Sequence, residues 1–220
     1  FTVRRGITKG IGELKNTYKS GKGGQSMARV DQDMSLLSMM VIFGFSIVVM
    51  FGLYHSMIGD VGYTIFTTIL MLIASFIFVA VSSYIVGLVG SSNNPVSGMT
   101  ISALLGVAAL FLVLGFTGDS AILATLGVAS IVCCAACTAG DCSQDLKTGV
   151  LIGSTPKNQQ WAQVIGVIIP AFVIGPVLTL LHNAYGIGTG LKAPQATLFA
   201  SITEALFGKG NLPYDLVAYG

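Results

Sequence analysis

The chain has 220 residues, of which 53% are hydrophobic and only 9% are charged, and its mean hydropathy is +0.82. Because an ordinary soluble domain carries about 25% charged residues, this composition argues against a soluble enzyme, a disordered tail and a nucleic-acid-binding protein. It indicates a membrane protein, and the 28 glycines are in keeping with the higher glycine content of transmembrane helices.

The charged residues are unevenly distributed along the chain. Seven of the eleven basic residues lie in the first 29 positions, where Glu13 is the only acid, so this segment carries +6 and the rest of the chain −4. A basic segment directly before an apolar stretch is typical of a cytoplasmic flank. We therefore predict that residues 1–33 form a basic amphipathic segment on the cytoplasmic surface, and we expect no nucleic-acid partner. Residues 11–20 are a candidate amphipathic helix, and the favoured alternative for them is a solvated or lipid-touching loop.

Five uncharged stretches are long enough to cross a bilayer as helices, which takes about 20 apolar residues. The predicted spans cover residues 36–54, 64–89, 99–116, 120–139 and 161–181. The second and third come from one run of 58 residues without an acidic or basic side chain, which a polar turn at 90–98 divides. We expect Pro170 and Pro176 to interrupt the fifth span.

The span count and the charges agree on one topology. If the N-terminal segment is cytoplasmic, four crossings return Lys147 and Lys157 to the cytoplasm, as the positive-inside rule requires. We predict an all-α, polytopic transmembrane bundle over residues 34–181, with broken or re-entrant helices. Residues 182–220 are expected to hold a re-entrant or interfacial helix at 197–207 and the start of a further span. The chain begins with phenylalanine rather than methionine and ends in an apolar stretch, so we expect a portion of a longer protein.

The polar turn between the second and third spans is the first candidate site. Its sequence, GSSNNPVSGMT at 90–100, places two amides and three serine hydroxyls between long apolar stretches. Pro95 has no N–H and disfavours helix at Asn94, and polar groups freed at such a break contact the substrate in transporters with discontinuous helices. The alternative is an ordinary cytoplasmic turn.

The segment that follows the fourth span, residues 133–161, is the second candidate site. Asp141 and Asp145 are four residues apart, so on a helix they share one face. Carboxylates at the mouth of a bundle can take up protons or coordinate cations. The alternative is a solvated loop between short helices, with Ser143 and Thr155 as caps and Pro156 at a first helical position.

The cysteines and the isolated ionisable residues carry weaker signals. Cys133, Cys134, Cys137 and Cys142 include one C-x-x-C pair but no second pair and no nearby histidine, so a zinc or iron–sulfur site is weakly supported. We expect these thiols to pack between helices, and we predict no metal site and no cofactor. Four isolated residues are expected at the membrane interface: Asp60, Asp119, His182 and Glu204.

Several of these strings together resemble one known family. The strings NPVSGMT, AGDCSQDLKTG, GSTPKNQQ and LKAPQATLFASITEALFGKGNLPY are similar to segments of the oligopeptide transporter (OPT) family, whose branches include bacterial members and the plant yellow stripe-like metal-chelate transporters. The resemblance implies an all-helical secondary transporter, not an enzyme, that imports oligopeptides or peptide-like metal chelates with proton coupling. It also implies that this chain is a partial one.

The resemblance also suggests which residues do the work. The motif positions that we assign to substrate binding are Asn93, Asn94, Pro95, Ser97, Gly98, Thr100 and Gln144, and those that we assign to coupling or gating are Asp141, Asp145, Lys147 and Thr148. Our hypothesis is that Asn93, Asn94 and Ser97 hydrogen-bond the substrate backbone, since amides offer donors and acceptors without net charge. One of the two aspartates would change its protonation during transport. Three positions depart from the family pattern: Met34, Cys142 and Val150.

The expected setting follows from the same resemblance. We predict an integral protein of a bacterial or archaeal inner membrane whose partners are the peptide or chelate, protons, lipid, and the remaining spans of a longer chain or a second copy. A channel-forming or structural subunit remains an alternative. An intramembrane aspartyl protease is a remote one, because Asp119, Asp141 and Asp215 follow Gly or Tyr but the G-x-G-D form is absent.

Overall fold

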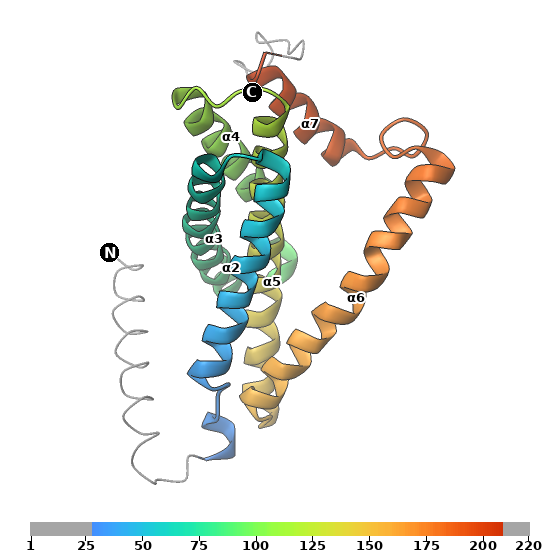
Figure 1. The fold of residues 1–220 in the computed structure, drawn as a ribbon. Helices are drawn as coiled ribbons and strands as arrows, with labels where there is room; N and C mark the ends of the chain where they lie inside the picture. Colours follow the sequence, from blue (N-terminus) through green and yellow to red (C-terminus); the bar gives the residue numbers. More distant parts are fainter. Residues whose placement is uncertain (1–27, 209–220) are drawn as a thin grey trace.

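The structure is a computed structural model that describes residues 28–208, and this part of the chain is almost entirely helical. The helices are α2 (Leu36–Ile58), α3 (Val61–Val89), α4 (Val96–Val113), α5 (Asp119–Ile152), α6 (Pro156–Tyr185) and α7 (Pro194–Leu206), with short 3-10 turns η1 (Arg29–Asp31) and η2 (Ser91–Asn93). Figure 1 shows α2 to α5 side by side as a bundle, while α6 leaves the lower end of α5 at an angle. Five helices are long and apolar enough to cross a membrane, which confirms the predicted all-α membrane bundle.

The predicted spans match helices α2 to α6 in order. The main differences are where α4 ends, where α5 ends, and whether the prolines interrupt α6. α4 stops at Val113 because Gly115, at φ 72°, turns the chain so that the Phe116 N–H donates to the carbonyl of Phe111. α5 continues through the polar residues to Ile152, well past the predicted end at 139. α6 runs unbroken through both of its prolines, so the expected interruption is wrong.

The alternative of a solvated loop between the fourth and fifth spans is also wrong. Ser143 lies inside α5, where its hydroxyl donates to the Ala139 carbonyl and caps no helix. Thr155 precedes α6 without a side-chain cap hydrogen bond, whereas Pro156 does occupy the first helical position. Proline is favoured there because its missing N–H has no partner in the first turn.

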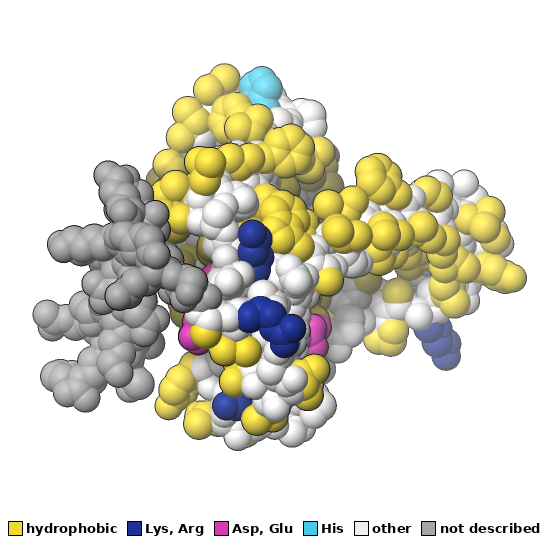
Figure 2. Space-filling model, turned by 90° about the horizontal axis from the view of Figure 1, so that it is seen from below, with side chains coloured by type: hydrophobic (Ala, Val, Ile, Leu, Met, Phe, Trp, Pro, Cys, Tyr) yellow, Lys and Arg dark blue, Asp and Glu magenta, His cyan; other side chains and the backbone are white. Residues whose placement is uncertain are grey.

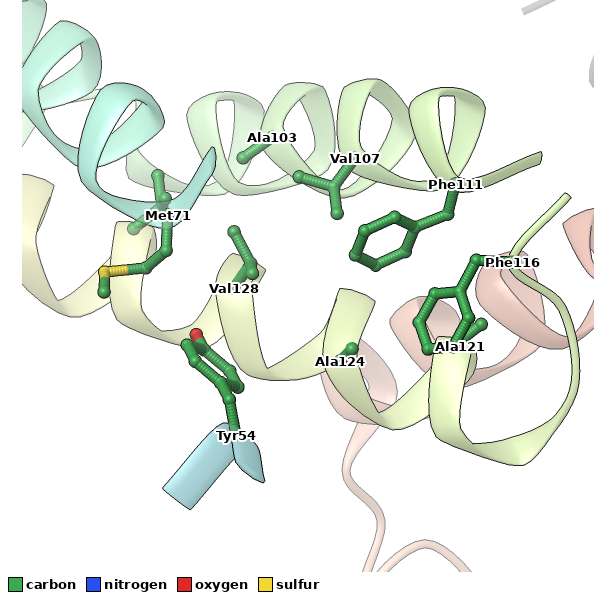
Figure 3. Packing of buried hydrophobic residues seen from close by; sticks show 10 residues of the cluster. Tyr54, Met71, Ala103, Val107, Phe111, Phe116, Ala121, Ala124 and Val128 are labelled. Carbon is green, nitrogen blue, oxygen red and sulfur yellow. The ribbon is translucent and has the colours of Figure 1, made fainter. Parts of the chain in front are cut away.

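The chain packs around α5, which contacts α2, α3, α4 and α7 as well as the start of α6. Its inward residues are mostly small, and Figure 3 shows Ala124 beneath Phe111 of α4 and Ala121 beside Phe116. The rings of Phe111 and Phe116 meet edge to face at a centroid distance of 5.1 Å. Small residues let helix backbones approach closely, which is how helices associate in lipid.

Helix α6 differs from the other spans in its surroundings. Against the rest of the described chain it buries none of its residues, although apolar side chains cover all of its sides. An apolar cleft of ≈ 680 Å³ separates its first half from α2, with Phe45 on one wall and Val167 on the other. α7 then returns to contact α4 and α5.

Two predictions concern residues outside the described part of the chain. The candidate amphipathic helix at 11–20 and the start of a further span after 214 both lie there. The helical patch predicted at 197–207 falls largely within α7, Pro194–Leu206.

Candidate functional site

The polar third of α5, residues 140–149, belongs to the second candidate segment and contacts the first. The 34 residues of α5 extend over about 51 Å at 1.5 Å per residue, against a hydrocarbon layer about 30 Å thick. Residues 140–149 therefore reach the edge of the apolar layer while still belonging to the helix. The α3–α4 break packs on one side of this polar third, and the start of α6 packs on the other.

The α3–α4 break is short and well held. Gly90, at φ 84°, ends α3, and the amide of Asn93 turns back so that Nδ2 donates to the Val89 carbonyl at 3.2 Å. Asn94 is extended, and Pro95 directly precedes the first residue of α4. Proline disfavours helical backbone in the residue before it, and Asn94 is extended at ψ 122°, so α3 and α4 are separate helices.

Asn94 is tied to two other helices. Its Nδ2 donates to Ser82 Oγ of α3 at 2.7 Å and lies 3.5 Å from the carbonyl of Ala136 of α5. The Ser82 hydroxyl in turn donates to the same carbonyl of Ala136. Asn94 Oδ1 is buried and has no hydrogen-bond partner within residues 28–208. The side chain lies directly over Gly140.

Gln144 makes a second link between the break and α5. Its Oε1 accepts a hydrogen bond from the Ser91 N–H at 3.0 Å. Ala136, Gly140 and Gln144 are spaced four residues apart, so one stripe of α5 receives the whole break.

The two aspartates lie on the exposed side of the same helix, four residues apart as predicted. Asp141 Oδ2 is 4.0 Å from the Cys137 sulfur. Asp145 faces α6, where its Oδ2 accepts from Gln163 Nε2 at 3.3 Å. Both carboxylates are therefore exposed within the described chain, and Asp145 contacts the neighbouring helix.

The other motif residues are placed around this centre in different ways. Ser97 and Gly98 are exposed in the first turn of α4, and Lys147 is exposed on α5. Thr100 and Thr148 use their hydroxyls within their own helices, donating to the carbonyls of residues 96 and 144. The structure thus brings the α3–α4 break, with Asn94, onto the stripe of α5 that carries Gln144, but it does not bring Thr100 into the same polar group.

Sequence reasoning missed some polar residues that complete the site. Ser82 gave no local signal because it is one serine in a long apolar span. Gln160 accepts from the Met34 N–H at 2.7 Å through Oε1, and its Nε2 donates to Asp33 Oδ1 at 3.2 Å. The string GSTPKNQQ contributes to the family resemblance, but its local pattern does not predict that it fastens the start of α6 to residues 33–34.

Most basic residues of the described chain lie at the end of the bundle where α5 ends and α6 begins. Figure 2, seen from below, shows Lys and Arg side chains close to acidic ones in the middle of a largely apolar surface. Arg29 donates to the Gly153 carbonyl at 3.0 Å, and the Lys157 N–H donates to the Gln32 carbonyl. Within residues 28–208 the four cysteines are free thiols and no cluster of metal-ligating residues is found.

Comparison with known proteins identifies a family. The sequence model described as "OPT oligopeptide transporter protein" matches residues 1–220. A protein of Haemophilus influenzae named "Putative oligopeptide transporter" is 33% identical over 94% of this chain and 38% of its own length.

Two plant proteins match smaller parts of the chain. "Probable metal-nicotianamine transporter YSL5" of Oryza sativa is 29% identical over 47% of this chain and 16% of its own length. "Probable metal-nicotianamine transporter YSL6" of Arabidopsis thaliana is 27% identical over 64% and 22%. No solved structure matches the chain. The chain therefore spans well under half the length of the relatives it resembles.

Proposed function

This chain belongs to the OPT oligopeptide transporter family, and from that premise we propose that it is part of a secondary transporter for oligopeptides or peptide-like metal chelates. The observation that carries the proposal is the α3–α4 break fastened to the polar third of α5. Non-helical backbone at the membrane persists where protein or a water-filled cavity satisfies it. A break that α5 supports in this way suits a substrate path.

The proposed substrate contacts come from the break itself. Asn93 and Ser97 are exposed and Asn94 carries a carbonyl oxygen without a partner in the described chain. Side-chain amides and hydroxyls offer both donors and acceptors, which suits the peptide groups of an uncharged backbone. Gln144 would hold the break in place while contributing its amide nitrogen.

Asp141 and Asp145 are the proposed coupling residues. In this mechanism an aspartate takes up a proton while the site is open to the outside and releases it when the site opens to the cytoplasm. Asp145 contacts α6 through Gln163, so its charge can influence how α5 and α6 sit against each other. Lys147 and Thr148 lie beside the pair on α5, with Lys147 exposed.

The proposed orientation puts this end of the bundle in the cytoplasm. Arg29, Lys147 and Lys157 lie near the ends of helices there, and cytoplasmic loops are richer in Lys and Arg. In a bacterial or archaeal inner membrane, import would then proceed toward the polar third of α5.

Reconstitution of the complete gene product tests the proposal. Purified protein in liposomes would be offered radiolabelled tetra-alanine or nickel–nicotianamine, with and without an imposed pH gradient. We expect one probe to accumulate above its equilibrium level only when the gradient is present. Uptake of neither probe would contradict the proposal, and uncoupled ion currents without probe accumulation would favour a channel.

A further inference from the structure

We propose that Ser82 of α3 and Gly140 of α5 are positioning residues that fix the side chain of Asn94 for substrate. Ser82 would set which end of the amide points inward, and Gly140 would leave the space in which the amide lies. The inference rests on the proposed role of Asn94 in binding substrate, and it adds two residues to which no role has been assigned.

Ser82 determines the orientation of the amide through its single proton. The side chain is fully buried, with 0% exposure, and its hydroxyl donates to the Ala136 carbonyl. With that proton committed, the oxygen can only accept, so the group of Asn94 that faces it must be the NH₂ group. The observed contact from Asn94 Nδ2 to Ser82 Oγ, at 2.7 Å, fits this requirement.

The same contact leaves the amide oxygen available. Asn94 Oδ1 is buried and without a partner in the part of the chain that the structure describes. Buried acceptors are rarely left without a donor, because the loss of solvation is not compensated. A substrate N–H that reaches this oxygen while the amide is held in place would supply the missing donor.

Gly140 provides the space for this arrangement. A Cβ at this position would lie 2.9 Å from Asn94 Nδ2 and 3.0 Å from Val86 Cγ2, and 3.4 Å from Ser82 Oγ. Even alanine would therefore push the amide away from Ser82. Glycine at position 140 therefore leaves the room that the amide of Asn94 occupies at this contact.

The chain offers matched controls for both residues. Gly106 lies inside α4 and a Cβ there would meet no atom of the described chain within 4 Å. Ser130 is an exposed serine of α5 whose hydroxyl donates to the Leu126 carbonyl one turn away. Gly106→Ala and Ser130→Ala therefore make the same chemical changes away from Asn94.

The test measures uptake kinetics of the complete gene product with whichever of tetra-alanine and nickel–nicotianamine it transports. For Ser82→Ala and Gly140→Ala we expect the KM to rise at least tenfold, with the maximal rate changed less than threefold. Gly106→Ala and Ser130→Ala should leave the KM within twofold of the wild type. The melting temperature in detergent is recorded for every variant, so that loss of fold is separated from loss of binding.

The KM values and melting temperatures together separate failure of this inference from failure of the proposed role of Asn94. An unchanged KM in the folded Ser82→Ala and Gly140→Ala variants would overturn the inference, and so would a lowered melting temperature with an unchanged KM. If Asn94→Leu itself transports normally, the proposed role of Asn94 fails and this inference falls with it. If Asn94→Leu loses uptake while both positioning variants keep the wild-type KM, only the inference about Ser82 and Gly140 fails. If neither probe is transported, both proposals fail.

Discussion

Helices α5 and α6 follow each other in the chain and are both long and apolar, yet they differ completely in their surroundings. α5 contacts five other helices, whereas α6 buries no residue against the rest of the described chain. The inward side of α5 carries small residues such as Ala121 and Ala124, while α6 presents large side chains such as Phe172 on its surface. Since lipid tails are as apolar as the side chains, hydropathy drives insertion but small residues and polar contacts drive helix packing.

The comparison explains how each helix serves the proposed site. α5 packs against several helices, so its polar third is a fixed platform for the α3–α4 break. Within residues 28–208, α6 is fastened near its start, where Gln159 and Gln163 contact Asp145. The rest of α6 remains available to lipid or to further helices.

The largest expected effect is a loss of stability when a large side chain packed against α5 is truncated, compared with the same truncation on α6. Phe111→Ala empties a fully buried position against α5, and Phe→Ala in a packed core costs about 3–5 kcal/mol. Phe172→Ala changes a side chain on α6 that is 79% exposed, so we expect no measurable loss. Thermal unfolding of the 220-residue chain in detergent checks both.

Equal losses for the two phenylalanine variants would contradict the division between a packed α5 and an unpacked α6. A loss for Phe172→Ala that appears only in the complete gene product would instead show that further helices cover α6.

The next largest effect is expected on pH-driven accumulation of the probe when Asp145, at the contact between α5 and α6, is changed. Asp145→Asn removes the titrating group but keeps an oxygen for Gln163, so the contact itself is preserved. We expect pH-driven accumulation of the probe to fall at least tenfold, which corresponds to about 1.4 kcal/mol, while exchange of probe between equal concentrations continues. Asp60→Asn, at the N-terminus of α3, is the control.

If Asp145→Asn keeps full pH-driven accumulation, the same measurement on Asp141→Asn decides whether the other carboxylate carries the proton. Wild-type accumulation by both variants would exclude this pair from coupling.

A smaller loss of stability is expected when the hydrogen bonds between the start of α6 and residues 33–34 are removed. Gln160→Leu removes the acceptor for the Met34 N–H and the donor to Asp33. A hydrogen bond of this kind contributes about 0.5–1.5 kcal/mol, so the melting temperature should fall by only a few degrees. Gln195→Leu, an exposed amide of α7, should change it less, and an equal fall for both variants would contradict the fastening role.

The number and order of the spanning helices could be predicted from the sequence, because uncharged stretches of sufficient length are a strong signal. The end of α5 was misjudged because its polar residues look like a loop, whereas a helix continues beyond the membrane wherever its backbone bonds are kept. The break at Asn94 and Pro95 was also predictable. Ser82 was not, because a contact between residues 82, 94 and 136 depends on tertiary packing that local pattern does not contain.

If the α3–α4 break forms part of the substrate path, replacing Asn94 should stop transport, and initial rates of probe uptake by Asn94→Leu measure this. Asn183→Leu makes the same change at an exposed amide near the far end of α6. In equally folded and equally reconstituted protein, we predict that Asn94→Leu abolishes uptake while Asn183→Leu keeps the wild-type rate. Wild-type uptake by Asn94→Leu would exclude the α3–α4 break from the substrate path and contradict the proposed role of Asn94.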